Sequence, residues 1–198
     1  MTLMKSQQAQ LGTPAKDFSL PSSDGKQYTL SDFTASKVLV IIFTCNHCPY
    51  AQAAKPKLHV VWEKYRHQSV QFVAINPNDS AQYAEDAIEH MKEEKYSYPF
   101  PYLRDEQQEI ARAYGAVCTP DIFVYDHARA LAYHGQIDDD RPGLTALAAN
   151  VIFGKALSSK NTASSDLERA LDALIAGKIP DIHQKPSMGC SIKWKNSA

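Results

Sequence analysis

The chain has 198 residues and a formal net charge of −1, from 21 basic and 22 acidic residues. This length suits one domain with a single buried core, and the balanced charge gives no electrostatic basis for binding nucleic acid or an anionic membrane. We therefore predict a single domain over residues 1–198, with a core at about 12–177, a C-terminal tail at 178–198, and neither nucleic acid nor a membrane as a partner.

The N-terminus and the apolar runs predict the compartment. The first eleven residues contain Lys5 and three glutamines where an export signal needs an apolar stretch. The longest apolar run, Val38–Phe43, is far too short to span a bilayer. We therefore expect a cytoplasmic protein, in a reducing compartment where a cysteine pair is more often catalytic than structural.

The first third of the chain predicts a hairpin followed by a central strand. Phe18–Pro21 and Lys26–Leu30 flank Asp24–Gly25, a pair typical of tight turns. Ser31–Phe33 predicts a single helical turn. Val38–Thr44 is almost continuously apolar, which predicts a strand that is buried on both faces of a sheet.

The middle of the chain predicts alternating helices and strands. A helix should run from Cys48 to about Arg66, with a kink where Pro56 removes a hydrogen bond. The remaining expected elements, in chain order, are a strand at Val70–Ile75, a charged surface helix from Asp79 or Ser80 to about Glu94, a packed loop at Tyr96–Pro101 leading into Tyr102–Arg104, and a helix at Glu106–Tyr114 that Gly115 ends.

The last third predicts a second hairpin and further helices. Its expected elements are strands at Ile122–Tyr125 and Ala130–His134, a polar loop at Asp138–Pro142, a helix at Leu144–Phe153, a linker at Ser158–Ser165, a helix at Asp166–Ala176, and an irregular tail that contains Cys190. We interpret Asp138–Asp140 as a solvated loop rather than a cation site. The overall order indicates an α/β fold with a mixed central sheet.

Two cysteines three positions apart lie where the apolar strand should end and a helix should begin. If Cys45 precedes the first helical turn, Cys48 lies one turn further along the same face, at a separation that suits a disulfide. The positive end of the helix dipole should lower the pKa of Cys45, and an imidazolium at His47 should lower it further. The pattern predicts a redox dithiol, with Cys45 and Cys48 catalytic and His47 tuning the thiolate.

A structural zinc site needs a second pair of ligands, and the sequence has no second C-x-x-C or H-x-x-x-H. We therefore predict no bound metal and no cofactor. Two inert core cysteines remain an alternative, although they would not need to lie at the start of a helix.

The motifs Cys45-Asn46-His47-Cys48-Pro49 and Cys118-Thr119-Pro120-Asp121, in this order of elements, resemble the thioredoxin superfamily over about residues 12–177. The N-terminal hairpin is similar to that of the peroxiredoxin-like and TlpA/ResA-like branches. The resemblance implies a thioredoxin-like fold with a C-terminal extension. It also implies a cis bond between Thr119 and Pro120, with Pro120 against the dithiol and the Thr119 backbone binding substrate. We expect a reduction potential tens of millivolts above that of a thioredoxin with Gly-Pro between its cysteines.

The sequence departs from these families at several positions. Leu39 and Thr44 replace a buried Asp and a Trp of thioredoxins, and Ala51 replaces a Glu of many TlpA/ResA-like proteins. The proton acceptor for Cys48 is therefore open between His47, Lys55 and water. Thr44 also does not fit the peroxiredoxin spacing P-x-x-x-T-x-x-C.

These observations predict a thiol-disulfide oxidoreductase in which Cys45 attacks a disulfide and Cys48 resolves the mixed disulfide. Its expected partners are a protein or small-molecule disulfide substrate and a thiol electron donor. A thiol peroxidase and a non-enzymatic copper or zinc carrier remain as alternatives. Cys118 and Cys190 are possible additional redox residues, and Cys118 is equally well explained as a buried structural thiol.

Overall fold

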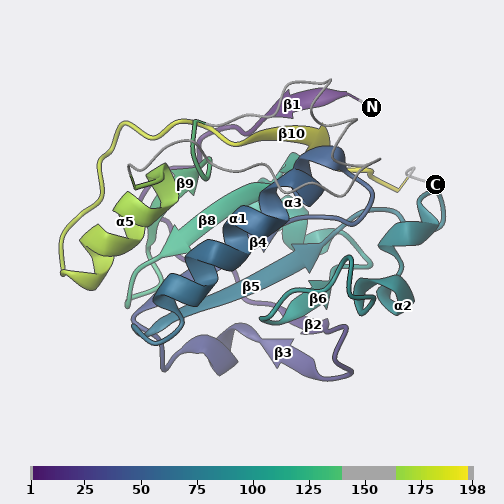
Figure 1. Cartoon of the computed structure of the whole chain (residues 1–198), viewed down its shortest axis with the longest axis horizontal. Helices are drawn as coiled ribbons and strands as arrows, with labels where there is room; N and C mark the ends of the chain where they lie inside the picture. The colour runs from purple at the N-terminus through teal and green to yellow at the C-terminus, as the bar shows by residue number, and fades with distance from the viewer. Residues whose placement is uncertain (1, 140–163, 196–198) are drawn as a thin grey trace.

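The computed structural model describes residues 2–139 and 164–195. At its centre is a five-stranded sheet in the order β6-β5-β4-β8-β9 (Figure 1). The strands are β4 (Val38–Phe43), β5 (Val70–Asn76), β6 (Tyr102–Arg104), β8 (Asp121–Tyr125) and β9 (Leu131–Gly135). Because β4 pairs in parallel with β5 and antiparallel with β8, the sheet is mixed, as predicted.

Helices cover one face of this sheet. α1 (Pro49–Tyr65) and α5 (Asp166–Ile175) lie in front of the sheet in Figure 1. Val40 and Ile42 of β4 belong to the same buried cluster as Leu58 of α1 and Leu171 of α5. The helix α5 begins with a capping box in which the hydroxyl of Ser165 accepts a hydrogen bond from the backbone N–H of Glu168.

The opposite face is covered by the N-terminal hairpin and by α3 (Glu109–Tyr114). The hairpin strands are β2 (Ser19–Pro21) and β3 (Gln27–Thr29), and the 3₁₀ turn η1 (Leu30–Phe33) follows them. Leu39, Ile41 and Phe43 of β4 pack here with Phe33 and Tyr114. All six residues of β4 are therefore buried, which confirms that this strand is central.

α1 begins at Pro49, the first position of the helix, where the missing proline N–H costs no hydrogen bond. The helix continues through Pro56 to Tyr65. α3 begins at Glu109 rather than Glu106, because Gln108 adopts a left-handed conformation with φ of 62°. It ends at Gly115, as predicted.

The predicted surface helix over about residues 79–94 is wrong. The chain forms a short 3₁₀ turn, η2 (Ala84–Asp86), and a single helical turn, α2 (Ile88–Met91), separated by the extended residue Ala87. Asp86 and Met91 are fully buried. The charged composition suggested exposure, whereas Asp86 has buried polar partners that hold it inside the protein.

The predicted irregular tail is also wrong. Residues Met188–Ser191 form β10, which pairs antiparallel with β1 (Leu3–Lys5) on one side and with β7 (Cys118–Thr119) on the other. Figure 1 shows the purple β1 and the yellow β10 side by side. β1, β10 and β7 thus form a three-stranded sheet that is separate from the central one.

A buried polar cluster anchors the segment that follows β1. His134 Nε2 lies 2.8 Å from the hydroxyl of Ser6 and 2.9 Å from a carboxylate oxygen of Asp121. His134 Nδ1 accepts a hydrogen bond from the backbone N–H of Ala9 at 2.9 Å, which leaves the proton on Nε2. These contacts fasten the N-terminal segment to β8 and β9.

The expected helix at 144–153 and the residues 140–142 and 158–163 of the expected loop and linker lie outside the described residues. Asp138 and Asp139 are described, and they form ion pairs with Lys57 at 2.9 Å and Lys185 at 2.5 Å. Among the helices of residues 2–139 and 164–195, none combines the length and the apolar character that a bilayer crossing requires.

Candidate active site

Cys45 and Cys48 lie where β4 ends and α1 begins. Cys48 occupies the N-cap position of α1, and it packs with Cys45 in one buried cluster. Both cysteines are free thiols in this structure. Their exposed fractions are only 4% for Cys45 and 0% for Cys48, so the dithiol is formed but covered.

Thr119 contacts both sulfurs from the opposite side. The peptide bond between Thr119 and Pro120 is cis, as the family resemblance implied. The hydroxyl of Thr119 lies 3.2 Å from Cys45 Sγ, and its carbonyl oxygen accepts a hydrogen bond from Cys48 Sγ at 3.4 Å. One fully buried residue therefore holds the two thiols in place.

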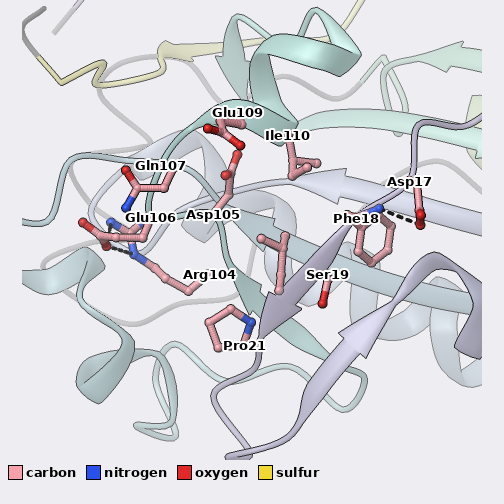
Figure 2. A pocket seen from close by; sticks show the side chains of 11 residues that line it. Asp17, Phe18, Ser19, Pro21, Arg104, Asp105, Glu106, Gln107, Glu109 and Ile110 are labelled. Atoms are coloured by element: carbon pink, nitrogen blue, oxygen red, sulfur yellow. Dashed lines mark hydrogen bonds and ion pairs between the residues drawn. The ribbon is translucent and has the colours of Figure 1, made fainter.

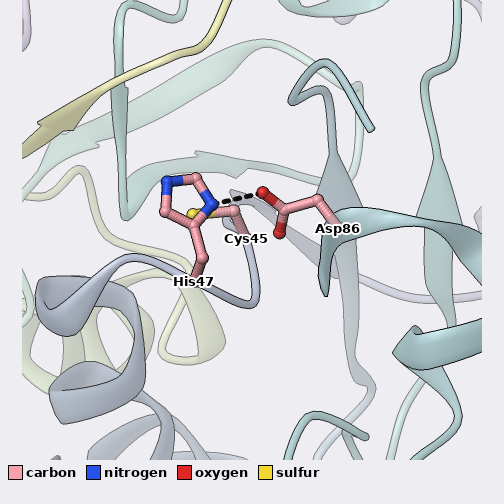
Figure 3. A group of neighbouring side chains, drawn as sticks. All are labelled: Cys45, His47 and Asp86. Carbon is pink, nitrogen blue, oxygen red and sulfur yellow. Dashed lines mark hydrogen bonds and ion pairs between the residues drawn. The ribbon is translucent and has the colours of Figure 1, made fainter. Parts of the chain in front are cut away.

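A carboxylate–imidazole pair lies beside Cys45, and no sequence motif indicated the carboxylate. His47 Nδ1 is 2.5 Å from Asp86 Oδ2, with side-chain exposures of 8% and 0% (Figure 3). The imidazole stacks on the ring of Tyr83, with centroids 4.3 Å apart. Its Nε2 is buried and has no hydrogen-bond partner in the described part of the chain.

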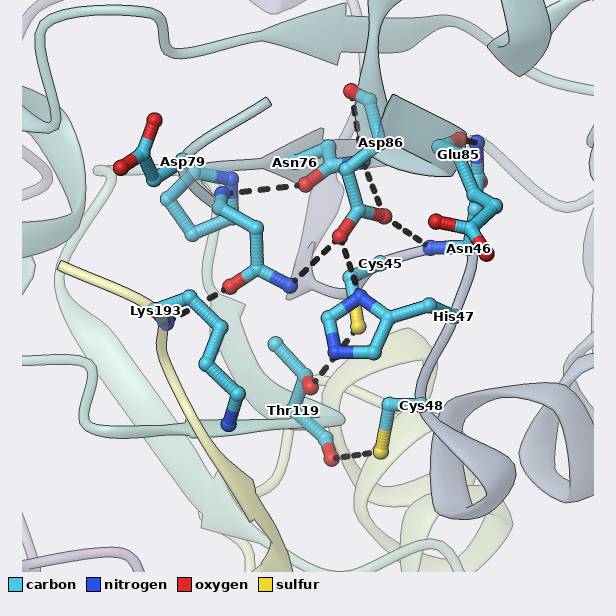
Figure 4. A network of polar contacts seen from close by, with 12 residues as sticks. Cys45, Asn46, His47, Cys48, Asn76, Asp79, Glu85, Asp86, Thr119 and Lys193 are labelled. Atoms are coloured by element: carbon cyan, nitrogen blue, oxygen red, sulfur yellow. Dashed lines mark hydrogen bonds and ion pairs between the residues drawn. The ribbon is translucent and has the colours of Figure 1, made fainter. Parts of the chain in front are cut away.

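The Asp86 carboxylate is held by four donors (Figure 4). It accepts hydrogen bonds from the backbone N–H of Asn46 at 2.6 Å, from His47, and from the side-chain amides of Asn76 at 3.1 Å and Asn78 at 2.9 Å. Burial raises the pKa of Asp86, but the hydrogen bond and the charge of His47, with the bonds from Asn78 and Asn46, outweigh it and lower the pKa below its usual value. Asp86 is therefore ionised at neutral pH.

The predicted low pKa of Cys45 is wrong for this structure. Burial raises the pKa of Cys45, the interaction with Cys48 and the charge of Asp86 raise it further, and the Thr119 hydroxyl opposes this only in part. Burial also raises the pKa of Cys48, but hydrogen bonds from Cys190, from Cys45 and from the backbone of Ala51 outweigh it and bring the pKa of Cys48 far below its usual range.

The two thiols of the pair therefore differ, with the pKa of Cys45 raised and that of Cys48 lowered. The helix begins at Pro49, so Cys48 rather than Cys45 lies against the unpaired N–H groups of the first turn. The sequence argument placed the helix dipole correctly but could not include the burial of Cys45.

The two remaining cysteines differ in their relation to the dithiol. Cys190 of β10 belongs to the same buried apolar cluster as Cys45 and Cys48, and it pairs with Thr119. Cys118 is fully buried outside that cluster, and its thiol donates weakly to the carbonyl oxygen of Pro120 at 3.8 Å. Burial raises the pKa of Cys118, which supports its interpretation as a structural thiol.

Lys55, one of the expected proton acceptors for Cys48, is engaged elsewhere. Its ammonium donates to the backbone carbonyls of Glu94 at 3.1 Å and Lys95 at 2.7 Å. His47 is the expected proton acceptor that lies in the site, because a ring nitrogen of His47, Cys45 Sγ and an oxygen of Asp86 all lie within 4.8 Å of one another.

A separate open groove of about 480 Å³ lies between β2 and the segment that precedes α3 (Figure 2). Its lining includes Asp17, Phe18, Arg104, Glu106 and Ile110. None of its lining residues belongs to the cysteine site.

Two solved structures place the fold. An uncharacterized conserved protein from Geobacillus kaustophilus is 40% identical, with a TM-score of 0.87 over 100% of this chain and 99% of that chain. The thioredoxin domain of a thiol-disulfide oxidoreductase from Bacteroides vulgatus is 16% identical, with a TM-score of 0.54 over 75% of this chain and 100% of that domain. The predicted thioredoxin-like fold is therefore confirmed.

Two curated relatives are redox proteins by name. Thiol-disulfide oxidoreductase ResA of Geobacillus thermodenitrificans is 25% identical over 116 residues, which are 59% of this chain and 63% of ResA. The chloroplastic peroxiredoxin Q of Oryza sativa subsp. japonica is 25% identical over 104 residues, which are 52% of this chain and 45% of the relative. Since the AhpC/TSA family profile matches residues 11–134, which include Cys45, Cys48 and Pro120, the chain belongs to the AhpC/TSA family.

Proposed function

We propose that the protein is a thiol-disulfide oxidoreductase that works through Cys45 and Cys48. The observation that carries this proposal is that the two cysteines share one buried cluster at the start of α1, and that Thr119 contacts both sulfurs. The similarity to ResA and the membership of the AhpC/TSA family support it.

Loss of the Cys45 proton starts the reaction. A ring nitrogen of His47 lies within 4.8 Å of Cys45 Sγ and accepts this proton. The transfer leaves a thiolate on Cys45, the more exposed residue of the two at 4% against 0%. The Cys45 thiolate then attacks a substrate disulfide, a mixed disulfide forms, and one substrate sulfur leaves as a thiolate.

Cys48 completes the exchange. It gives its proton to the first substrate thiolate and attacks Cys45 Sγ, the mixed disulfide breaks, and the second substrate thiolate leaves. Two electrons have passed from the dithiol to the substrate, and a Cys45–Cys48 disulfide remains. In this proposal His47 stabilises the Cys45 thiolate, Asp86 positions His47, and Thr119 with Pro120 forms the surface that receives the substrate.

Disulfide reduction by the cysteine variants tests this proposal. Cys45→Ser should lose activity towards a disulfide substrate, and Cys48→Ser should accumulate a mixed disulfide, because the resolving sulfur is missing. Cys118→Ser is the matched control, since its thiol faces Pro120 rather than the dithiol. Full activity in Cys45→Ser would overturn the proposal.

The redox potential of the dithiol gives a second measurement. The interactions that lower the pKa of Cys48 stabilise the reduced form, so the disulfide should be more oxidising than that of a Gly-Pro thioredoxin, with about 30 mV for each 1.4 kcal/mol. The expected electron donor is a thiol, and the substrate is a protein or small-molecule disulfide. The cytoplasmic location remains a prediction from the sequence.

A thiol peroxidase is the second candidate, and the similarity to peroxiredoxin Q favours it. Cys45 would be oxidised to a sulfenic acid and resolved by Cys48. Stopped-flow mixing with hydrogen peroxide tests it, and a rate no faster than that of free cysteine excludes it.

The carrier alternative has one favourable observation, the grouping of Cys45, His47 and Asp86. Thiolate, imidazole and carboxylate groups all bind zinc. Metal analysis of protein purified under reducing conditions tests this role, and less than about a tenth of an equivalent would exclude it.

A further inference from the structure

β10 lies directly over the dithiol. Its neighbour on one side is β7, and the register places Cys190 opposite Thr119. Thr119 is also the residue whose hydroxyl and carbonyl contact Cys45 and Cys48. The tail therefore pairs with the residue that holds both sulfurs of the dithiol.

The contact between β10 and β7 is unusually close at Gly189. A Cβ at this position would lie 1.9 Å from the carbonyl oxygen and 2.6 Å from the carbonyl carbon of Thr119. No side chain fits there, so glycine is required for this approach of the two backbones. The approach delivers the side chain of the next residue, Cys190, into the cysteine cluster.

Three sulfurs consequently share one buried cluster. Cys45, Cys48 and Cys190 pack together with Ala51, and each is less than 5% exposed. Cys190 therefore packs against the dithiol from the side on which β10 pairs with β7. Strand alternation directs Thr119 towards the dithiol and the preceding Cys118 away from it.

We propose that Cys190 is a third catalytic cysteine, which accepts the disulfide from the Cys45–Cys48 pair by bonding to Cys48. This inference rests on the proposed function. The Cys190 thiolate attacks Cys48 Sγ, the Cys48–Cys190 bond forms and the Cys45–Cys48 bond breaks. The electron pair leaves on Cys45, which takes the proton that Cys190 gave up, so the exchange involves no net oxidation.

The exchange assigns different partners to different sulfurs. Cys45 returns to its reduced form beside His47 and meets the next disulfide substrate. The disulfide now lies on β10, where the thiol electron donor attacks Cys190. The family match ends at residue 134, so this third cysteine lies outside the part of the chain that the AhpC/TSA family profile covers.

Mapping of disulfides tests the inference. Trypsin keeps Cys45 and Cys48 together in peptide 38–57, Cys190 in peptide 179–193 and Cys118 in peptide 113–129. Cys45→Ser protein is oxidised with diamide, blocked with N-ethylmaleimide, digested and analysed by mass spectrometry. We expect peptides 38–57 and 179–193 to be linked in more than half of the molecules. The Cys45→Ser/Cys190→Ser double variant is the matched control and should show no such link.

Wild-type protein and Cys190→Ser protein are then compared for their disulfides and for their steady-state rate. After oxidation the wild type should contain both the internal 38–57 disulfide and the link to 179–193, and Cys190→Ser should lower the steady-state rate with a thiol donor at least tenfold. Cys118→Ser should leave both disulfides in place.

A link in fewer than a tenth of the Cys45→Ser molecules, or a link to peptide 113–129 instead, overturns the role of Cys190. If the internal disulfide forms in the wild type and the link to 179–193 does not, the third cysteine is excluded and the proposed function stands. If neither bond forms, both proposals fail.

Discussion

Replacement of Gly189 by alanine tests whether β10 controls access to the dithiol. The added Cβ would lie 1.9 Å from the Thr119 carbonyl oxygen, a backbone atom that cannot rotate away. β10 must therefore move off β7, and overpacking of this kind costs about 1–3 kcal/mol. This free-energy cost destabilises only the state in which β10 is paired with β7, here called the closed state.

The magnitude of the effect follows from this cost. Because 1.4 kcal/mol corresponds to a tenfold change in an equilibrium constant, the fraction of molecules with β10 separated should rise about 5- to 150-fold. The assay is alkylation by iodoacetamide, followed as the modified fraction of peptide 38–57. Its rate should increase within this range, since Cys45 and Cys48 are almost fully buried when β10 is closed.

Ser191→Ala is the matched control on the same strand. In the described part of the chain, the only side-chain partner of the Ser191 hydroxyl is the ammonium of Lys193, at 3.1 Å. Its removal should therefore change the alkylation rate less than twofold. Urea unfolding must show that Gly189→Ala is folded. A folded Gly189→Ala protein whose cysteines react at the wild-type rate would refute the control of access by β10.

Three further changes probe the site and its support. Asp86→Asn should lower the free energy of unfolding by about 3 kcal/mol at pH 7, because a buried carboxylate with four donors is lost. Because the pKa of Asp86 is lowered in the folded protein, its carboxylate stabilises the fold above the ordinary value of 3.8, and this stabilisation is lost as the pH falls through the lower folded value. The difference in unfolding free energy between the wild type and Asp86→Asn, measured in urea, should therefore shrink in acid. A difference that widens in acid contradicts the stabilising role of the ionised carboxylate. Thr119→Val should raise the pKa of Cys45, measured as the pH dependence of its alkylation, because the hydroxyl that lowers this pKa is removed, whereas Thr119→Ser should not. Tyr65→Phe should cost about 1 kcal/mol in urea unfolding, because the hydroxyl of Tyr65 donates to Asp172 at 2.6 Å, and an unchanged stability would show that this bond contributes nothing.

The central part of the fold could be predicted from local signals. The apolar run of β4 has no polar residue to expose, so it had to be a central strand, and the first cysteine had to lie at the end of it. Pro49 marked the start of α1, and Gly115 marked the end of α3. The resemblance to thioredoxin-like proteins then placed Thr119 and Pro120 opposite the dithiol.

The features that were missed depend on contacts between distant parts of the chain. β1 and β10 have three and four residues and no alternating pattern, and they are strands because β1 pairs with β10 and β10 also pairs with β7. Asp86 lies in a charged stretch that is typical of a surface helix, and its buried donors come from segments that the sequence does not connect to it. The order of the thiol pKa values depends on burial, which no local motif encodes.

The pairing of β1 with β10 has a practical consequence. Leu3 lies opposite Cys190, so segments from the two ends of the chain meet beside the sulfurs. Donor and acceptor dyes attached at Thr2 and Lys195 would report any separation of these strands as a change in energy transfer. Such a label pair would follow the β1–β10 contact directly, without a probe placed on any of the four cysteines.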